Sequence, residues 1–151
     1  MTMTREEILQ IERTSSESQI QHVCVCWFRH TFAKVAYLLF AIPNGGRRDK
    51  RTGAVMKYEG AVSGISDLIL LYPFGGKASL CIEMKTPKRK GTSAGRQSES
   101  QKAWQQLVET YGSVYRVCHG IFEFVEAVCL YLHIDPQPYI DDVLDKYPIY
   151  R

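Results

Sequence analysis

The segment from residue 64 to residue 85 constrains the fold of this chain more than any other. Two apolar runs flank the sequence Pro-Phe-Gly-Gly-Lys, and this arrangement predicts a β-hairpin. Because side chains alternate between the two faces of a strand, Glu83 and Lys85 share one face of the second strand. A hairpin centred on Gly75 then places Asp67 directly opposite Glu83.

This pairing puts two carboxylates side by side on a sheet. The Cβ atoms of Asp67 and Glu83 would lie roughly 5 Å apart, and like charges in such a pair destabilise a sheet. A divalent cation relieves the repulsion, since Mg²⁺ binds carboxylate oxygens at about 2.0–2.1 Å and keeps waters that a phosphate can replace. Lys85 on the same face can orient or deprotonate a water, or stabilise a developing oxyanion. The hairpin therefore predicts a metal site suited to phosphate chemistry.

The motifs around this pair resemble those of the VRR-NUC family, the virus-type replication-repair nucleases of the PD-(D/E)xK superfamily. Asp67 followed by Glu83-Met84-Lys85 is similar to the Asp…Glu-x-Lys signature of the superfamily. The resemblance covers about residues 15–132 and implies a restriction-endonuclease-like core. Three further motifs occur in the order seen in the family: Pro43-Asn44-Gly45-Gly46, Gly60-x-x-x-Gly64-x-x-Asp67-Leu68 and Gln97-x-x-x-Gln101-x-x-Trp104.

The resemblance also implies roles for individual residues. One or two Mg²⁺ or Mn²⁺ ions would be held by Asp67, Glu83 and the backbone carbonyl of Met84. Gln101 would position the attacking water, and the alternative is a capping, water-bonded glutamine at the start of its helix. Glu17 would be an acidic residue of the first helix that reaches the metal, and the alternative is that it complements the dipole of that helix.

Basic residues concentrate in the middle of the chain. The net charge of the whole sequence is +3, yet residues 47–102 contain 12 Lys or Arg against 5 Asp or Glu. This segment surrounds the predicted metal site, which favours a nucleic-acid substrate over a merely solvated surface. For Asn44, a turn-forming role is the alternative to DNA binding. The candidate DNA-binding residues are Asn44, Arg47, Arg48, Lys50, Arg51, Lys88, Arg89, Lys90 and Arg96.

The sequence predicts a single nuclease domain over residues 1–151, with its core at about 15–133 and a C-terminal tail at 134–151. Helical and strand patterns alternate, which predicts an α/β fold with a mixed central β-sheet flanked by α-helices. No signal-peptide pattern or membrane-length apolar run is present, so we expect a cytoplasmic protein without membrane contact. The expected helices are 18–36, a short helix after residue 46, 98–111 and 121–133; the expected strands are 37–43, the two hairpin strands and 114–118.

The favoured function is a metal-dependent endonuclease that hydrolyses DNA phosphodiester bonds. The resemblance implies a preference for branched, flapped or four-way-junction DNA in repair, recombination or phage replication. One alternative is a sequence-specific restriction-type endonuclease, and another is a catalytically inactive DNA-binding module with a nuclease fold. A small-molecule metalloenzyme is the third alternative, and the basic central segment counts against it.

A homodimer is also expected. One 151-residue domain carries one site, whereas a duplex or junction presents two strands, and a two-fold dimer supplies two sites. The tail over residues 134–151 is rich in aromatic and aliphatic side chains, which are enriched at interface cores. The tail is therefore a candidate subunit contact, and packing on its own protomer is the alternative.

Overall fold

A four-stranded mixed β-sheet forms the centre of the protein. The structure is a computed structural model, and it describes residues 2–43, 50–88 and 96–150. Neighbouring strands pair antiparallel except for β3 and β4, which are parallel. The predicted α/β class with a mixed sheet is confirmed. In their order across the sheet, the strands are β1 (Leu39–Ala41), β2 (Leu68–Leu70), β3 (Leu80–Lys85) and β4 (Val114–His119).

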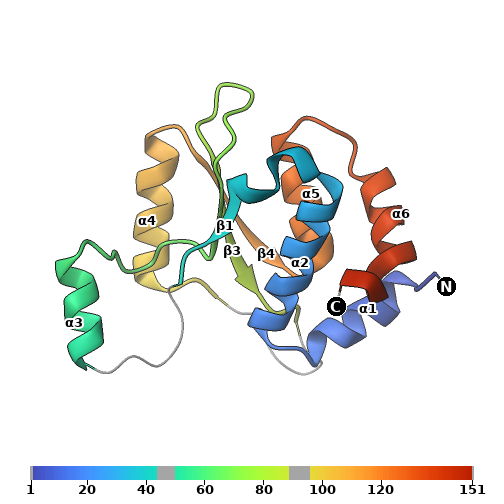
Figure 1. Ribbon diagram of the computed structural model, residues 1–151, viewed down its shortest axis with the longest axis horizontal. Helices are drawn as coiled ribbons and strands as arrows, with labels where there is room; N and C mark the ends of the chain where they lie inside the picture. Colours follow the sequence, from blue (N-terminus) through green and yellow to red (C-terminus); the bar gives the residue numbers. More distant parts are fainter. Residues whose placement is uncertain (1, 44–49, 89–95, 151) are drawn as a thin grey trace.

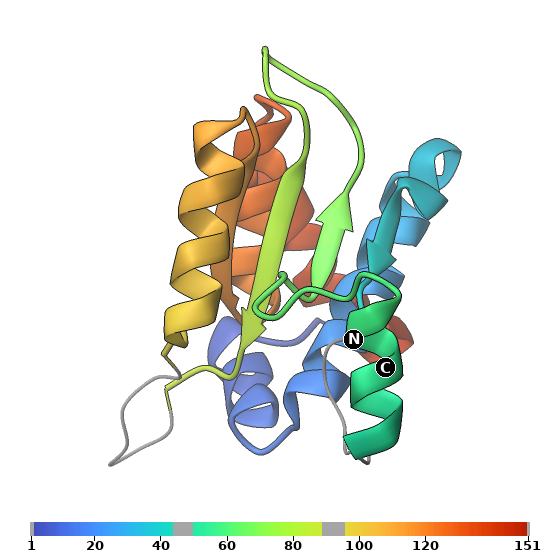
Figure 2. The same cartoon turned by 90° about the vertical axis from the view of Figure 1, so that its left-hand side faces the viewer.

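Helices cover both faces of this sheet. α4 lies on one face and connects β3 to β4, while α2 and α5 cover the other face and α6 lies beyond α5 (Figure 1). α3 stands outside these layers, on the same side as α4 (Figure 1, Figure 2). Within the described part of the chain, no helix has both the length and the apolar character that a membrane crossing requires. The helices are α1 (Arg5–Arg13), α2 (Glu17–Thr31), α3 (Lys50–Tyr58), α4 (Glu99–Thr110), α5 (Ile121–Tyr131) and α6 (Gln137–Lys146), with the 3₁₀ helices η1 (Ala33–Leu38) and η2 (Tyr147–Tyr150).

The hydrophobic core lies between the sheet and the layer formed by α2 and α5. Because strand side chains alternate, every second residue of β2 and β3 turns into this core. Met84 is 1% exposed, as expected for a core side chain between two site residues. The core cluster includes Leu68, Leu70, Leu80, Ile82 and Met84 of the hairpin, Trp27 and Phe28 of α2, and Phe124, Val125 and Val128 of α5.

The β2–β3 hairpin has the predicted register. Leu68 pairs with Ile82, so continuing the ladder by one residue sets Asp67 opposite Glu83. The alternating pattern selects this register, because a shift by one residue would turn the apolar side chains of a strand to the opposite face of the sheet.

The tip of the hairpin is a tight turn made by Gly75 and Gly76. Their φ angles are +57° and +79°, and the N–H and C=O groups of Phe74 and Lys77 bond to each other across the turn. Two consecutive residues with positive φ suit the twist of the flanking strands, and glycine adopts them without steric cost.

Two sequence-based expectations about apolar residues are wrong. α2 ends at Thr31 and the chain continues as η1, so β1 begins at Leu39 and not at residue 37. Tyr37 is 83% exposed instead of lying in a buried strand. The spacing of apolar residues in the helix expected at 98–111 predicts that Tyr111 faces inward, but Tyr111 is 79% exposed. A residue in a short apolar run is buried only if another part of the structure packs against it, and no such packing buries Tyr37 or Tyr111.

The C-terminal tail packs on its own protomer. Ile140 and Val143 of α6 and Tyr147 of η2 are buried within this chain, and η2 packs against α2. The hydroxyl of Tyr150 donates to Asp142 at 2.9 Å. The hydrophobic core therefore extends past residue 133. Of the two roles considered for the tail, the structure shows packing on its own protomer.

The core also extends toward the N-terminus, through α1, a helix that the sequence pattern did not lead us to expect. Thr4 caps α1 and exchanges hydrogen bonds with Glu7, a Thr-x-x-Glu pattern that does signal a helix start. Near the other end of α1, Glu12 is 1% exposed, and its Oε2 accepts the backbone N–H of Ile121 at 2.8 Å. A carboxyl group from α1 thus accepts a backbone N–H from the first turn of α5. Burial raises the pKa of Glu12 to about 7.

We expect Glu12→Gln to flatten the pH dependence of stability. A carboxyl whose folded-state pKa is raised favours folding while it is protonated, so its contribution is lost as pH rises from about 4.5 through about 7. Between pH 5 and pH 8, the free energy of unfolding of the variant should rise relative to that of wild type by on the order of 2–3 kcal/mol. Urea unfolding at both pH values measures this, with Glu109→Gln on exposed α4 as control. Parallel pH profiles for Glu12→Gln and wild type would contradict the assignment.

Candidate active site

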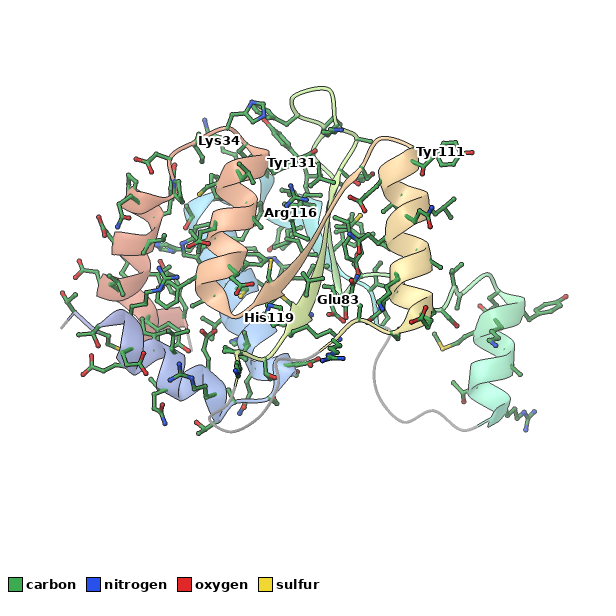
Figure 3. The ribbon with its side chains drawn as sticks, turned by 180° about the vertical axis from the view of Figure 1, so that it is seen from behind. Lys34, Glu83, Tyr111, Arg116, His119 and Tyr131 are labelled. Carbon is green, nitrogen blue, oxygen red and sulfur yellow. The ribbon has the colours of Figure 1, made fainter. Side chains whose placement is uncertain are left out.

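The hairpin brings Asp67 and Glu83 together near the end of β3, from which the chain continues toward α4. Asp67 directly precedes β2, and its Oδ2 accepts the backbone N–H of Met84 at 2.7 Å. Its backbone carbonyl accepts the N–H of Ile42 at 2.8 Å, so the residue is fixed from both neighbouring segments. Glu83 lies in the middle of the sheet and is 3% exposed; its side chain projects between the sheet and α4 (Figure 3).

The Glu83 carboxyl sits in an environment that opposes its negative charge. Burial raises its pKa well above the usual range, and the charge of Asp67 and a hydrogen bond to that carboxyl raise it further. Lys85 lowers this pKa, with its Nζ 3.7 Å from Glu83 Oε1. Glu83 Oε2 is buried and has no hydrogen-bond partner among the described residues. If both carboxyls are ionised, they carry two negative charges, of which Lys85 offsets one.

Gln101 joins this pair from the first turn of α4. Its Oε1 accepts the N–H of Ser98 at 2.8 Å, and its Nε2 donates to Glu83 Oε1 at 2.7 Å. The Ser98 hydroxyl accepts the N–H of Gln101 in return, which completes a capping box. Both sequence-based interpretations thus describe part of what Gln101 does: it caps its helix and it reaches the site. The cap also sets the orientation of the amide, so that Nε2 faces Glu83.

Glu17 is the first residue of α2 and lies on the protein surface. Its charge raises the pKa of Glu83, which shows that it is within electrostatic range of the site. Among the described residues, however, no three His, Cys, Asp or Glu side chains come close enough to hold an ion together. Glu17 therefore does not complete a three-carboxylate cluster with Asp67 and Glu83, and its position at the start of α2 also suits the dipole-complementing role.

Comparison with known proteins decides the family of this chain. The model of the VRR-NUC domain matches residues 5–122. The chain belongs to the VRR-NUC family. A solved structure described as "VRR_NUC domain protein" superposes with a TM-score of 0.66 at 22% identity, over 80% of this chain and 90% of that chain. At that identity the likeness shows a shared fold, and the family is one of nucleases. No curated protein sequence matches this chain.

The basic residues predicted to bind DNA are only partly visible in this VRR-NUC domain. Lys50 and Arg51 begin α3. Lys88 and Arg96 are exposed and lie between β3 and α4, just before and just after residues 89–95 in the chain. The backbone carbonyl of Lys88 accepts from Nε of Arg13 at 3.3 Å, so α1 contacts the start of that segment. Five predicted residues lie outside the described part of the chain: Asn44, Arg47, Arg48, Arg89 and Lys90.

Tyr115 is a residue near the site that the sequence did not point to. It lies on β4 beside Cys81, is 1% exposed, and meets the ring of Trp104 edge to face at 6.0 Å. Burial raises the pKa of Tyr115 to about 12, and the charges of Glu83 and Asp67 act in the same direction. The sequence alone did not point to Tyr115, because its place beside Cys81 depends on the parallel pairing of β3 with β4.

Proposed function

We propose that this VRR-NUC domain is a metal-dependent endonuclease that hydrolyses DNA phosphodiester bonds. The observation that carries the proposal is the Asp67–Glu83 pair across β2 and β3, with Lys85 and Gln101 both directed at Glu83. A buried carboxylate pair of this kind costs stability unless a positive charge accompanies it. Membership in a nuclease family supports a phosphodiester as the bond that is cut.

The residues present fit a hard divalent cation. Glu83 Oε2 is buried without a partner in the described part of the chain, and the surrounding donors are carboxylate and carbonyl oxygens, which Mg²⁺ and Mn²⁺ prefer. Asp67, Glu83 and the backbone carbonyl of Met84 would hold the ion, and Glu17 adds negative charge within electrostatic range of them. When bound, the ion supplies Lewis-acid stabilisation of phosphate charge and lowers the pKa of bound water.

The chain's own side chains contribute position and charge. Nζ of Lys85 can donate to a phosphate oxygen as negative charge develops there, or exchange a proton with the attacking water. Nε2 of Gln101 carries a second N–H beyond the one used on Glu83, and that N–H can hold the water in line. The burial of Glu83 limits solvent around these groups, which strengthens each electrostatic contact.

The substrate we propose is branched, flapped or four-way-junction DNA, met during repair, recombination or phage replication in the cytoplasm. The test is purified protein with Mg²⁺ or Mn²⁺ on linear, flapped, forked and four-way-junction DNAs of the same sequence. Faster cleavage of the branched substrates supports the proposal. Cleavage of linear duplex at one sequence would favour a restriction-type enzyme, and binding without cleavage would favour an inactive module.

Neutralising Lys88, Arg89 and Lys90 together should weaken DNA binding and its salt dependence. For every phosphate that the variant no longer neutralises, the slope of log affinity against log salt should fall by about 0.9. The control neutralises Lys34 and Lys77, which are exposed; Lys34 lies at the upper edge of the view in Figure 3, away from Glu83. Binding titrations from low to high salt measure both variants. Equal slopes for the triple variant and wild type would show that those three residues only aid solubility.

We also propose that the protein acts as a homodimer, because a single site must otherwise act twice on two strands. Ile140, Val143, Tyr147 and Tyr150 of the tail are buried in their own protomer, so we place the subunit contact elsewhere on the surface. Light scattering at the concentrations used for cleavage measures the assembly. A monomer that still cuts both strands of a junction would contradict the dimer.

A further inference from the structure

Gly64 makes a backbone contact that joins the two halves of the candidate site. It lies on the loop that leads into Asp67, and its φ is +83°. A methyl group in the place of its hydrogen would stand 2.8 Å from the backbone nitrogen of Gln101 and closer still to the carbonyl of Ser100. Real Cβ atoms do not approach backbone this closely, so the first turn of α4 rests directly on the main chain at Gly64.

Positive φ alone does not account for this glycine. Gly60, earlier on the same loop, has a φ of +107° because it ends α3, where the N–H of Ala61 bonds to the carbonyl of Met56 at 2.9 Å. A methyl group at Gly60 would meet no atom within 4 Å. The two glycines therefore have the same kind of backbone geometry, but only Gly64 also needs to lack a side chain for packing.

We propose that Gly64 is a positioning residue of the active site, which holds the first turn of α4 so that Gln101 reaches Glu83. This inference rests on the proposed nuclease function. The bond from Gln101 Nε2 to Glu83 Oε1 is 2.7 Å long, and a hydrogen bond weakens steeply beyond about 3.2 Å. A methyl group at position 64 displaces the turn by more than this margin. Gly64 touches no reacting atom; it acts through Gln101.

The kinetic test compares Gly64→Ala with Gly60→Ala. Both substitutions strain a positive φ, and only the first also pushes on α4. We expect Gly64→Ala to lower kcat by about 10- to 100-fold, as for a misplacement of roughly 1 Å, with KM within about twofold of wild type. Gly60→Ala should keep kcat within about twofold. Wild-type kcat in Gly64→Ala, or an equal loss in both variants, overturns the proposal.

A second comparison shows whether Gly64 acts through Gln101. In a Gln101→Ala background the amide is already gone, so adding Gly64→Ala should lower kcat by no more than about twofold further. A loss in the double variant as large as the product of the single losses overturns the proposal. A merely structural role for Gly64 predicts that product.

A measurement that does not depend on cleavage can distinguish failure of the proposed function from failure of this inference. In ¹⁵N NMR spectra, the side-chain amide of Gln101 should shift in Gly64→Ala and keep its position in Gly60→Ala. Unchanged signals in both variants overturn the inference, even if wild type cuts DNA. If wild type cuts no DNA under any condition, the nuclease proposal fails while the NMR result still decides the contact.

A second variant covers the case in which Gly64→Ala does not fold. A glycine inserted between Ala61 and Val62, which are both exposed, leaves Gly64 intact but gives the loop slack. We expect this insertion to lower kcat and shift the Gln101 amide in the same direction as Gly64→Ala. Wild-type kcat together with an unshifted amide overturns the proposal.

Discussion

Glu83→Gln is expected to lower metal-supported DNA cleavage by more than about 10³-fold while the metal-free protein becomes more stable. The two effects have one physical cause. Glu83 is buried beside Asp67, so its negative charge destabilises the fold when no cation is bound. The same charge is what binds the cation. A glutamine has the same shape and can still accept the N–H of Gln101. Single-turnover cleavage and urea unfolding without metal measure the two halves of the prediction.

The same reasoning applies to Asp67→Asn, whose amide oxygen can still accept the N–H of Met84. Glu59→Gln, an exposed acid near the end of α3, is the matched control and should match wild type in both assays. Titration calorimetry with Mg²⁺ is the decisive measurement. If the Asp67→Asn, Glu83→Gln double variant still binds Mg²⁺ with wild-type affinity, these residues are not the metal ligands.

Lys85→Ala is expected to lower the cleavage rate by about 10²- to 10⁴-fold while Mg²⁺ binding persists. Its Nζ is 3.7 Å from Glu83 Oε1, and the side chain is only 12% exposed, so its charge acts where solvent screens it little. Lys77→Ala at the hairpin tip is the control for removal of a lysine elsewhere. Turnover near the wild-type level in Lys85→Ala would remove this residue from the mechanism.

Lys85→Arg separates two roles for the lysine. An arginine keeps the positive charge but does not release a proton under ordinary conditions. A variant that retains most of the rate would therefore support electrostatic stabilisation, whereas a loss as large as that of Lys85→Ala would support proton transfer through Nζ. Both rates should be measured at saturating Mg²⁺, so that a change in metal affinity does not enter the comparison.

The central hairpin is the part of the fold and of the site that local sequence specifies most completely. Asp67 and Glu83 are close in the chain, and the alternating side chains of the two strands leave one favourable register. The α/β class and the order of elements from α2 to α5 were predictable for a similar reason, because each segment carries its own periodicity. The position of Gln101 could be anticipated in part, since Ser98 and the spacing of its helix indicate where α4 begins.

Other features depend on contacts that no local pattern contains. Glu12 and Ile121 meet although 109 positions separate them, and only the completed core brings α1 to the start of α5. Tyr111 looked like a buried residue, yet it is exposed at the end of α4. Gly64 could be interpreted as a turn glycine, but its contact with Ser100 exists only once the loop and α4 have docked.

The sequence alone determined which residues face each other across the hairpin, because the alternation of apolar and polar side chains is a local pattern that a one-residue shift would reverse. It therefore determined that Asp67, Glu83 and Lys85 lie close together. The tertiary structure decided what surrounds that site: the burial of Glu83, the approach of Gln101 and the packing of the tail. These depend on docking between segments distant in the chain, where burial of apolar surface and close packing, and not local propensity, select the arrangement.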